Sequence, residues 1–597
     1  MIQMSETKEK LFKGGAFLTE DLTSDDIITP EDFTDEQKMI AKTTEDFIDK
    51  EVRPNLDELE EQNFDISVEL LKKAGELGLL GADVPEEYGG LGLDKTSSAL
   101  ITEEFSRAGG FSITHGAHVG IGSLPIVFFG NDEQKAKYLP KLATGELIAA
   151  YALTEATSGS DALGAKTTAV LNDAGTHYIL NGEKQFITNS AFADVFVVYA
   201  KIDGEHFSTF IVESDFPGVS TGAEEKKMGI KSSSTRTLIL NDAEVPVENL
   251  LGEKGKGHKI AFNILNVGRY KLAIGGVGGA KAALEVAAEY VNERKQFNTK
   301  ISSFSLTQEK LATMAARTYA NESAVYRTVG LFEQRMGSLT DEQLKDGREV
   351  AAAIAEYQIE CSMNKYTATE VLDYVVDEAV QMHGGNGFIQ EYEVERMYRD
   401  SRINRIFEGT NEINRLLVPG TLLKKAMKGE LPLLQQAQAL QEELVMKMPE
   451  EVGTGTLEQE KYLLKNAKKL VLFTAGLAAQ KYMQKIEREQ EILVNLADMV
   501  AEVYNMESAI LRTEKAINKS GEEANKQKLL YTQVYVQEAF NRMEADAKET
   551  LIAVEEGDNL RMMLSSLRKL TRHTPINVVA KKREIAAKII EEEKYVL

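Results

Sequence analysis

The sequence predicts a mainly α-helical protein with a central β domain and an extra α-helical domain at the C-terminus. Short β-branched runs lie between residues 168 and 240, and apolar residues return to helical spacing from about residue 256. The region after residue 430 is again strongly amphipathic. We therefore expect an arm over 1–30, a helical domain over 31–148, a middle β-barrel domain over 149–255, an α-helical bundle over 256–425, and a C-terminal α-helical domain over 430–597.

The N-terminal helices are predicted from their start and stop signals. Thr34-Asp35-Glu36-Gln37 is a capping box, and apolar residues follow it at roughly helical spacing. A second helix is predicted from Leu70, Leu71, Ala74 and Leu77, with Gly78 placed to end it. Further helical patterns extend to about residue 147.

The middle of the chain has the spacing of antiparallel strands. We expect turns at residues 172–175, at Asn181-Gly182 and at Asp203-Gly204. Such closely spaced strands favour an antiparallel barrel or sandwich over a parallel nucleotide-binding sheet. The predicted strands include Thr168–Leu171, Tyr178–Leu180, Val195–Ala200, Ser208–Val212 and Thr235–Leu240.

Two features of the helical regions have a structural interpretation. The run Gly275–Gly279 follows no strand and does not complete a dinucleotide fingerprint, so we expect it to allow close helix packing. After a linker at 453–456, apolar stripes run over 492–511 and 560–570. Such stripes usually form core, although a face that contacts a membrane remains an alternative.

Composition excludes several classes of function. The net charge of −25 argues against nucleic acid as a partner and against broad attachment to anionic lipid. Cys361 is the only cysteine, so no intrachain disulfide forms, which fits a reducing cytoplasm. No metal-ligand cluster is apparent, and no apolar run is expected to span a bilayer.

The most informative segment is Arg405–Ile413, which places Glu408 between Phe407 and Gly409. A carboxylate flanked by apolar groups is poorly solvated, so its pKa should rise toward neutrality. That suits a general base which removes a weakly acidic C–H proton. Taken alone, these residues favour a surface glutamate in a loop over a catalytic base.

Three further segments change that balance: Tyr151–Asp161, Arg294–Phe297 and Gln381–Phe388. In this order and spacing, the four segments resemble the acyl-CoA dehydrogenase family from about residue 30 to 420. The extra C-terminal region resembles the very-long-chain branch, as do Gly116-Ala117-His118 and Lys227–Lys231. The resemblance implies a flavoprotein that oxidises an acyl-CoA thioester to its trans-2-enoyl form, with Glu408 as the catalytic base.

The same resemblance implies the residues that bind FAD. The loop at Tyr151–Ser160 would meet the edge of the flavin, and Phe186 would pack on the flavin from a strand. Relatives commonly have Trp at the position of Phe186, and this chain contains no Trp. An arm from a neighbouring subunit would grip the pyrophosphate, so at least a dimer is implied. The implied cofactor-binding residues are Tyr151, Leu153, Thr154, Ser160, Phe186, Ile187, Thr188, Arg294, Gln296, Phe297, Gln381, Gly384, Gly385, Thr410 and Glu412.

The implied substrate-binding residues are fewer. Ser160 would meet the CoA moiety, Phe407 would line the acyl pocket, and Gly409 would let the ligand approach the backbone. Arg269, with Asn266 beside it, matches a CoA-contacting position, although a structural ion pair explains it equally well.

Gly268 occupies the position from which other branches of the family take their base. Glu408 therefore has no competitor there, and a glycine at this position is expected to leave room for a long acyl chain.

These features together predict a cytoplasmic, dimeric, FAD-dependent dehydrogenase of long-chain acyl-CoA in fatty acid β-oxidation. An electron-transfer flavoprotein would accept its electrons, and weak peripheral membrane contact through the C-terminal domain stays open. Two rivals share the fold: an acyl-CoA oxidase that uses oxygen, and a non-catalytic assembly protein. The preferred chain length and the choice between dimer and tetramer are not fixed by the residues.

Overall fold

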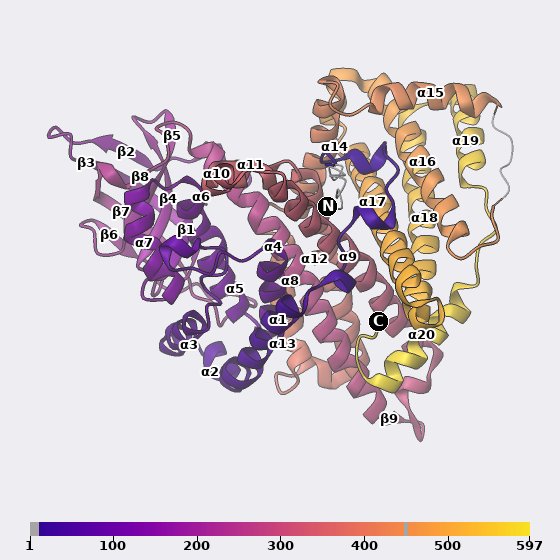
Figure 1. The fold of residues 1–597 in the computed structure, drawn as a ribbon, viewed down its shortest axis with the longest axis horizontal. Helices are drawn as coiled ribbons and strands as arrows, with labels where there is room; N and C mark the ends of the chain where they lie inside the picture. Colours follow the sequence, from indigo (N-terminus) through magenta and orange to yellow (C-terminus); the bar gives the residue numbers. More distant parts are fainter. Residues whose placement is uncertain (1–10, 447–451) are drawn as a thin grey trace, which may run out of the picture.

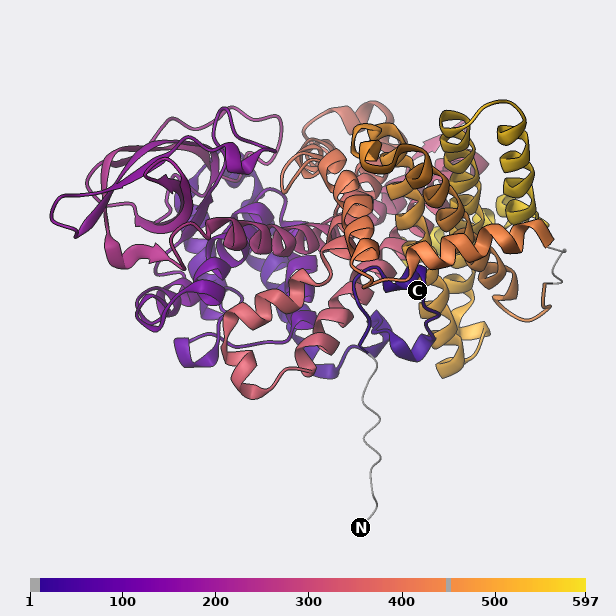
Figure 2. The same ribbon diagram turned by 90° about the horizontal axis from the view of Figure 1, so that it is seen from above.

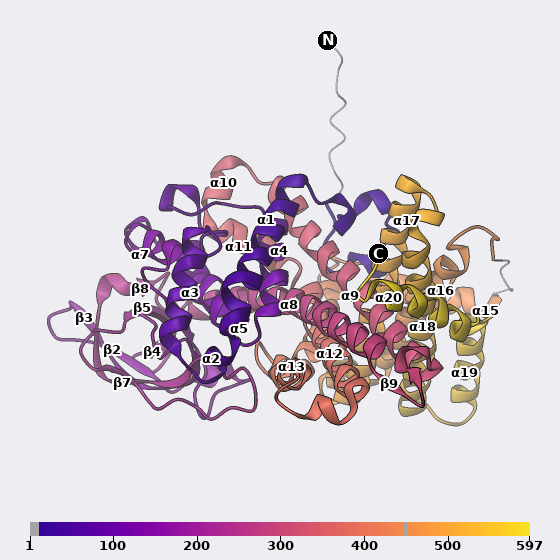
Figure 3. The ribbon, with the colours of Figure 1, turned by 90° about the horizontal axis from the view of Figure 1, so that it is seen from below.

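The computed structural model describes residues 11–446 and 452–597, in three parts arranged in a row (Figure 1). The β sheet and the N-terminal helices lie at one end. The long helices α8 (Gly257–Glu293), α9 (Ser305–Gly337) and α12 (Gln358–His383) form the middle, and the C-terminal helices form the other end. The views from above and below keep this order (Figures 2 and 3). Residues 1–10 of the predicted arm and 447–451 of the predicted C-terminal domain lie outside the described residues.

The N-terminal helices begin and end where their capping signals predict. The Thr34 hydroxyl accepts the Gln37 N–H at 3.2 Å at the start of the first predicted helix. Gly78 lies just after the second predicted helix and has a left-handed φ of 77°. The helices of this part are α1 (Asp35–Phe47), α2 (Leu56–Glu60), α3 (Phe64–Glu76), α4 (Lys95–Phe105), α5 (Phe111–Gly116), the π-helical η8 (Ala117–Gly122), α6 (Leu124–Phe129) and α7 (Asp132–Thr144).

The expectation that no apolar run could span a bilayer needs a correction. Phe111–Phe129, which covers α5, η8 and α6, is 19 residues long and apolar enough to pass that test by length and composition. It is also 78% buried inside the protein. Such burial is typical of a core segment, because a membrane-spanning helix would expose its apolar surface to the lipid.

The strands that follow the N-terminal helices form one sheet in the order β6-β7-β3-β2-β4-β5-β8, with β1 paired to β4. Most pairs are antiparallel, as predicted, but β1 and β2 each run parallel to β4. Parallel neighbours need a crossover connection, which the short turns did not reveal. The strands are β1 (Ala149–Ala152), β2 (Thr168–Leu171), β3 (His177–Thr188), β4 (Val195–Ile202), β5 (His206–Glu213), β6 (Val219–Thr221), β7 (Thr235–Pro246) and β8 (Leu250–Leu251).

One predicted turn is wrong. Asn181-Gly182 lies inside β3, where the register against β7 shifts between Leu180 and Gly182. Gly182 has φ 154°, and a Cβ there would lie 2.4 Å from the Thr167 hydroxyl. The Asn-Gly pair therefore marks a β-bulge here, because only glycine fits so close to the neighbouring segment at Thr167.

The middle helices pack closely through the glycines of α8. A Cβ on Gly276 would lie 3.1 Å from the Ala368 carbonyl oxygen of α12, and one on Gly278 would lie 2.5 Å from the Glu103 carbonyl oxygen of α4. The prediction of close packing at Gly275–Gly279 is confirmed at these two positions. The shorter elements of this part are β9 (Lys295–Gln296), β10 (Thr299–Lys300), α10 (Asp341–Lys345), α11 (Gly347–Ala355), α13 (Glu393–Ser401) and α14 (Asn411–Met427).

The C-terminal helices bury the stripes that the sequence predicts. The apolar residues of the stripe predicted over 492–511 are buried in α17 (Gln490–Ser520), and Leu567 and Leu570 of α19 (Gly557–Thr571) are buried as well. Leu560, Met563 and Leu564 are partly buried and pack against the same core. The helices are α15 (Leu433–Met446), α16 (Glu458–Tyr482), α17 (Gln490–Ser520), α18 (Lys526–Val554), α19 (Gly557–Thr571) and α20 (Val578–Glu592).

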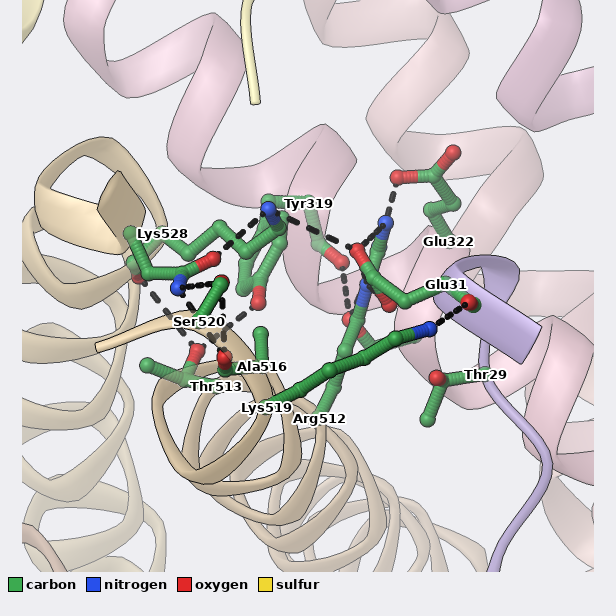
Figure 4. Close-up of polar contacts among 12 residues, drawn as sticks. Thr29, Glu31, Tyr319, Glu322, Arg512, Thr513, Ala516, Lys519, Ser520 and Lys528 are labelled. Atoms are coloured by element: carbon green, nitrogen blue, oxygen red, sulfur yellow. Dashed lines mark hydrogen bonds and ion pairs between the residues drawn. The ribbon is translucent and has the colours of Figure 1, made fainter. Parts of the chain in front are cut away.

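Residues 11–33 form a segment that lies along the middle and C-terminal helices. Its anchor is Arg512 of α17, which reaches between Glu31 at 2.9 Å and Glu322 of α9 at 2.6 Å (Figure 4). The guanidinium also lies 4.6 Å from the centre of the Tyr319 ring. Burial opposes ionisation of Glu322, but Arg512 and Lys281 lower its pKa to about 2. One arginine thus neutralises carboxylates from two distant segments.

Replacing Arg512 should destabilise this junction. Arg512→Met keeps an apolar stem over Tyr319 but leaves Glu322 buried with half of its compensation, a loss of about 3–5 kcal/mol for such pairs. We expect a lower midpoint of thermal unfolding and faster proteolysis within residues 11–33. Arg561→Met is the control, because Arg561 pairs with Asp558 at 2.9 Å with side chains 83% and 90% exposed. Equal effects of the two substitutions would contradict the anchoring role.

Candidate active site

Glu408 lies in a short loop between α13 and α14, in a strained backbone conformation. Its φ is 57°, which is left-handed and uncommon for a residue other than glycine, and Gly409 follows with φ 81°. Thr410 then caps α14 by accepting the Ile413 N–H at 3.2 Å. Strain of this kind persists only where surrounding contacts enforce it, and such places are often functional.

Those contacts hold the backbone of the loop rather than the Glu408 side chain. Lys365 Nζ donates to the Gly409 carbonyl oxygen at 2.8 Å, and Asn414 Nδ2 donates to the same oxygen at 2.9 Å. Arg269 Nε donates to the Glu408 carbonyl oxygen at 3.4 Å. Lys365, Asn414 and Arg269 therefore hold the loop from behind and leave the carboxyl group free to point elsewhere. Burial lowers the pKa of Lys365 to about 7, so its amine is only partly charged near neutral pH.

The Glu408 carboxyl group faces an internal cavity without a partner of its own. Its buried Oε2 atom has no hydrogen-bond partner among the described residues. Burial raises the pKa of Glu408 to about 7, although Arg269 and Lys365 oppose the rise. A carboxyl group with this pKa is half ionised near neutral pH, which is what a general base for a weak carbon acid requires.

Gly268 of α8 lies directly against this carboxyl group. A Cβ at Gly268 would be 2.5 Å from Glu408 Oε2. The Glu408 carboxyl group therefore lies beside the position from which other branches of the family take their base. Gly268 also lines the cavity, so a side chain there would compete with the Glu408 carboxyl group for the same space. The expectation that this glycine leaves room for the acyl chain stays a prediction.

The cavity has a volume of about 210 Å³ and lies between the N-terminal helices, α8, α12 and α13. Phe407 and Thr188 line it near Glu408. Its walls along α5, η8 and α8 are mostly apolar or small, although Ser112, His115 and Lys271 also line them. The apolar or small residues are Ile113, Gly116, Ala117, Gly120 and Ile121 on one side, and Gly268, Leu272, Gly275, Gly279 and Ala282 on the other.

The predicted flavin-edge segments lie side by side on the sheet. The Gln185 N–H donates to the Thr154 carbonyl oxygen at 2.8 Å, and Lys184 Nζ donates to the Leu153 carbonyl oxygen at 3.2 Å. The buried Lys184 also pairs with Glu155 at 2.7 Å. These bonds join the loop after β1 to the end of β3 and so place the two segments together.

The remaining residues of these segments differ in their exposure. Tyr151 is partly buried with its ring centre 5.3 Å from that of Tyr199, and Ile187 is buried. Ser160 is exposed. Phe186 is 57% exposed with φ 61°, so its ring presents a large apolar surface beside the loop. An apolar ring left in water is a site for a planar ligand to cover.

The motif implied to bind the FAD pyrophosphate, made of Arg294–Phe297 and Gln381–Phe388, lies elsewhere in the chain. Arg294, Gln296 and Phe297 form an exposed hairpin at the end of α8, where the Phe297 side chain is 91% exposed. Figures 1 and 3 show β9 of this hairpin well away from the sheet. The second part of the motif, Gln381, Gly384 and Gly385, ends α12.

The two parts of that motif are adjacent. The rings of Tyr290 in α8 and His383 in α12 stack with centres 3.9 Å apart, which joins the ends of the two helices. His383 Nδ1 lies 2.7 Å from the Ala379 carbonyl oxygen, so His383 is a packed residue, as predicted. Within one chain, this group and the flavin-edge group remain separate.

The predicted substrate residues are divided between the cavity and its support. Phe407 lines the cavity, whereas Arg269 and Asn266 are buried beneath the Glu408 loop, with Arg269 Nη1 3.1 Å from Asn266 Oδ1. Thr410 and the exposed Glu412 follow the loop at the start of α14.

Sequence reasoning missed the support from Lys365 and Asn414. Asn414 lies six residues after Glu408, so the motif could have suggested it. Lys365 carries no local signal, because it comes from α12, 43 residues earlier in the chain.

The residues present fit a flavin dinucleotide. The exposed Phe186 ring lies two residues before Thr188, which lines the cavity that the unpartnered Glu408 carboxyl group faces. The exposed hairpin carries Arg294, whose planar guanidinium suits phosphate. A flavin could lie between Phe186 and Glu408, provided that the hairpin which grips the phosphates belongs to another subunit.

Comparisons with known proteins identify the family of the chain. Acyl-CoA dehydrogenase family models match the N-terminal domain over 34–146, the middle domain over 150–243, and C-terminal domains over 255–423 and 466–569. A probable acyl-CoA dehydrogenase of Bacillus subtilis is 72% identical over 592 residues, covering 99% of this chain and 100% of the relative. The mitochondrial very long-chain specific acyl-CoA dehydrogenase of Rattus norvegicus is 35% identical, covering 82% and 75%.

A solved structure shows the same fold with its cofactor. The acyl-CoA dehydrogenase of Bacillus anthracis, crystallised in complex with FAD, has a TM-score of 0.97 and 73% sequence identity, covering 98% of this chain and 100% of that one. The cofactor is therefore FAD, and the enzyme is an acyl-CoA dehydrogenase with an additional C-terminal domain. By its sequence, its fold and the residues around Glu408, the chain belongs to the acyl-CoA dehydrogenase family.

Proposed function

We propose that the protein oxidises long-chain acyl-CoA thioesters to trans-2-enoyl-CoA as the first step of fatty acid β-oxidation. The observation that carries the proposal is Glu408, whose buried carboxyl oxygen has no hydrogen-bond partner among the described residues and whose pKa is about 7. A free base that borders an apolar cavity suits removal of a proton next to a thioester carbonyl.

The residues of this chain divide the work of that reaction. Glu408 accepts the proton from the α-carbon, while bound FAD accepts the hydride from the β-carbon. The Glu408 N–H donates no backbone hydrogen bond among the described residues, so it is available to the thioester oxygen as charge develops there. Lys365 and Asn414 hold the loop in place, so the base and this N–H need not reorganise.

The preference for long chains is supported by the length of the cavity. The lining residues of α8 run from Gly268 to Ala282, which are 14 positions apart in the chain. At about 1.5 Å per residue, this stripe is about 21 Å long. Gly275 has no atom within 4 Å of where its Cβ would lie, so this glycine widens the middle of the cavity.

The remaining parts of the proposal concern partners and location. Electrons pass to an electron-transfer flavoprotein, as the family resemblance implies, and the enzyme works in the cytoplasm. A homodimer would bring the exposed hairpin around Phe297 to the FAD of a second subunit, which one chain alone does not do. Peripheral membrane contact through the C-terminal helices is an accessory part of the proposal.

Glu408→Gln should keep the shape of the site and remove the base. We expect the FAD-loaded variant to bind palmitoyl-CoA but to reduce its flavin at least a thousandfold more slowly than the wild type. Anaerobic stopped-flow absorbance of the flavin measures this rate. Unchanged reduction in the variant would exclude Glu408 as the base. A wild type that is never reduced would favour an assembly protein, and rapid peroxide formation in air would favour an oxidase.

The rate of flavin reduction should follow the ionisation of Glu408. Because burial raises its pKa to about 7, the carboxyl group is protonated and inactive below that pH. The rate should rise about tenfold per pH unit below 7 and level off above it. Lys365 lowers the pKa of Glu408, so Lys365→Met should move the midpoint to higher pH. A lower plateau with an unchanged midpoint would mean that Lys365 only holds the loop.

Filling the middle of the cavity should shorten the preferred acyl chain. Gly275→Leu places a side chain where nothing lies within 4 Å, so we expect kcat/KM to fall at least tenfold for C16 esters and less than twofold for C8 esters. Gly420→Leu is a matched control, because Gly420 is also helical with no atom within 4 Å of its Cβ position. A parallel loss for both chain lengths would place the acyl chain elsewhere.

A further inference from the structure

The cavity lining includes a cluster of charged side chains on α13 and just after α4, in addition to the glycines and apolar residues along most of α8. The polar residues in this part of the lining are Arg107, Glu393, Arg396 and Asp400.

One contact places this cluster along α8. A Cβ on Gly278 would lie 2.3 Å from Ser106 Oγ, and Arg107 and Gly109 follow Ser106 by one and three residues. Gly109 therefore lies near Gly278, which is 10 positions along α8 from Gly268, the residue beside the base. An acyl chain that enters at Glu408 and follows α8 reaches this cluster.

Asp400 is the most enclosed member of this cluster. One of its carboxyl oxygens accepts the Ile230 N–H, and the other, Oδ2, is buried without a hydrogen-bond partner among the described residues. Burial raises the pKa of Asp400 to about 7, with Arg399 and Arg396 opposing the rise. An unpartnered oxygen at the edge of a cavity is costly unless a ligand or water satisfies it.

Arg396 and Asp400 border the same open space. A Cβ built on Gly109 would lie 3.7 Å from both Arg396 Nε and Asp400 Oδ2, and all three residues line the cavity. Arg396 forms one described ion pair, a long one of 3.9 Å with Glu393. The guanidinium and the carboxyl oxygen therefore both lie beside Gly109, which has no side chain to fill the space next to them.

We propose that this polar group of Gly109, Arg396 and Asp400 binds a hydroxyl group at the distal end of the acyl chain. The inference rests on the proposed function, since it takes the acyl chain to lie along α8. The ligand class is a long-chain ω-hydroxyacyl-CoA thioester, which the same active site would oxidise at its α and β carbons.

A hydroxyl group fits these residues better than the other possible chain ends. It both donates and accepts, so it can bond Asp400 in either protonation state while accepting from Arg396. A methyl group would leave Asp400 Oδ2 unpartnered, at the cost of a buried polar atom. A carboxylate would meet Arg396 but also face the carboxyl groups of Asp400 and Glu393.

The test compares each saturated acyl-CoA from C12 to C18 with its ω-hydroxy counterpart on the FAD-loaded enzyme. Anaerobic flavin reduction gives kcat/KM, and calorimetry gives Kd for the matching trans-2-enoyl-CoA products. We expect the ω-hydroxy ester to be favoured about tenfold in kcat/KM at one or two chain lengths, with a parallel difference in Kd. At other lengths the hydroxyl group would not reach the polar group, so the preference should vanish.

Three variants assign the preference to these residues. Asp400→Leu should reduce the ratio of ω-hydroxy to saturated ester to about one, and Arg396→Met should reduce it at least threefold. Arg396→Met keeps the test valid if Asp400→Leu fails to fold, because Asp400 also holds the Ile230 backbone. Arg399→Met is the control, since Arg399 lies on the same helix, pairs with Glu395, and does not line the cavity.

The outcomes separate this inference from the proposed function. Equal kcat/KM and Kd for both series at every length, with no change in the variants, would overturn the inference and leave long-chain oxidation intact. A clear preference for ω-carboxy esters would overturn the choice of a hydroxyl group. If no ester reduced the flavin, the proposed function would fail, and the calorimetric ratio would still decide whether the polar group binds a hydroxyl.

Discussion

The site depends on one constraint: the Glu408 carboxyl group must be buried, unpartnered and still precisely placed. A hydrogen bond to the carboxyl group would fix it but would also lower its pKa and weaken the base. The protein instead places every strong contact on the backbone around it. Lys365 and Asn414 bind the Gly409 carbonyl oxygen, and Arg269 binds that of Glu408. The cations limit the rise in pKa, so it stays near neutrality.

Helix α8 serves this arrangement through glycines that face different ways. Gly276 and Gly278 let α12 and α4 approach the helix closely, while Gly268 and Gly275 face the cavity. Side chains on the first pair would push the helices apart, and side chains on the second would displace Glu408 or fill the cavity. Close packing and an open interior are therefore achieved by neighbouring positions of one helix.

How far the sequence predicts this structure depends on how local each signal is. The Thr34 cap, the strand Thr168–Leu171 and the stripe on α17 are local patterns, and the structure contains them. The Asn181-Gly182 pair failed because a turn and a β-bulge use the same residues, and only the approach of Thr167 decides between them. Lys365 and the polar group at Asp400 were missed because they become functional only through contacts with distant segments.

The C-terminal helices also bear on the cavity, through a chain of buried charges. Lys281 immediately precedes Ala282 at the far end of the cavity wall, and it pairs with Glu103 of α4 and Glu322 of α9. Glu322 in turn pairs with Arg512 of α17, which holds Glu31 of the N-terminal segment (Figure 4). Because each of these charges needs its neighbour, a shift of α17 would leave Glu322 undercompensated and loosen Lys281. The C-terminal part of the chain therefore stabilises the wall along which the acyl chain is proposed to lie, although it contributes no residue to the cavity lining among the described residues.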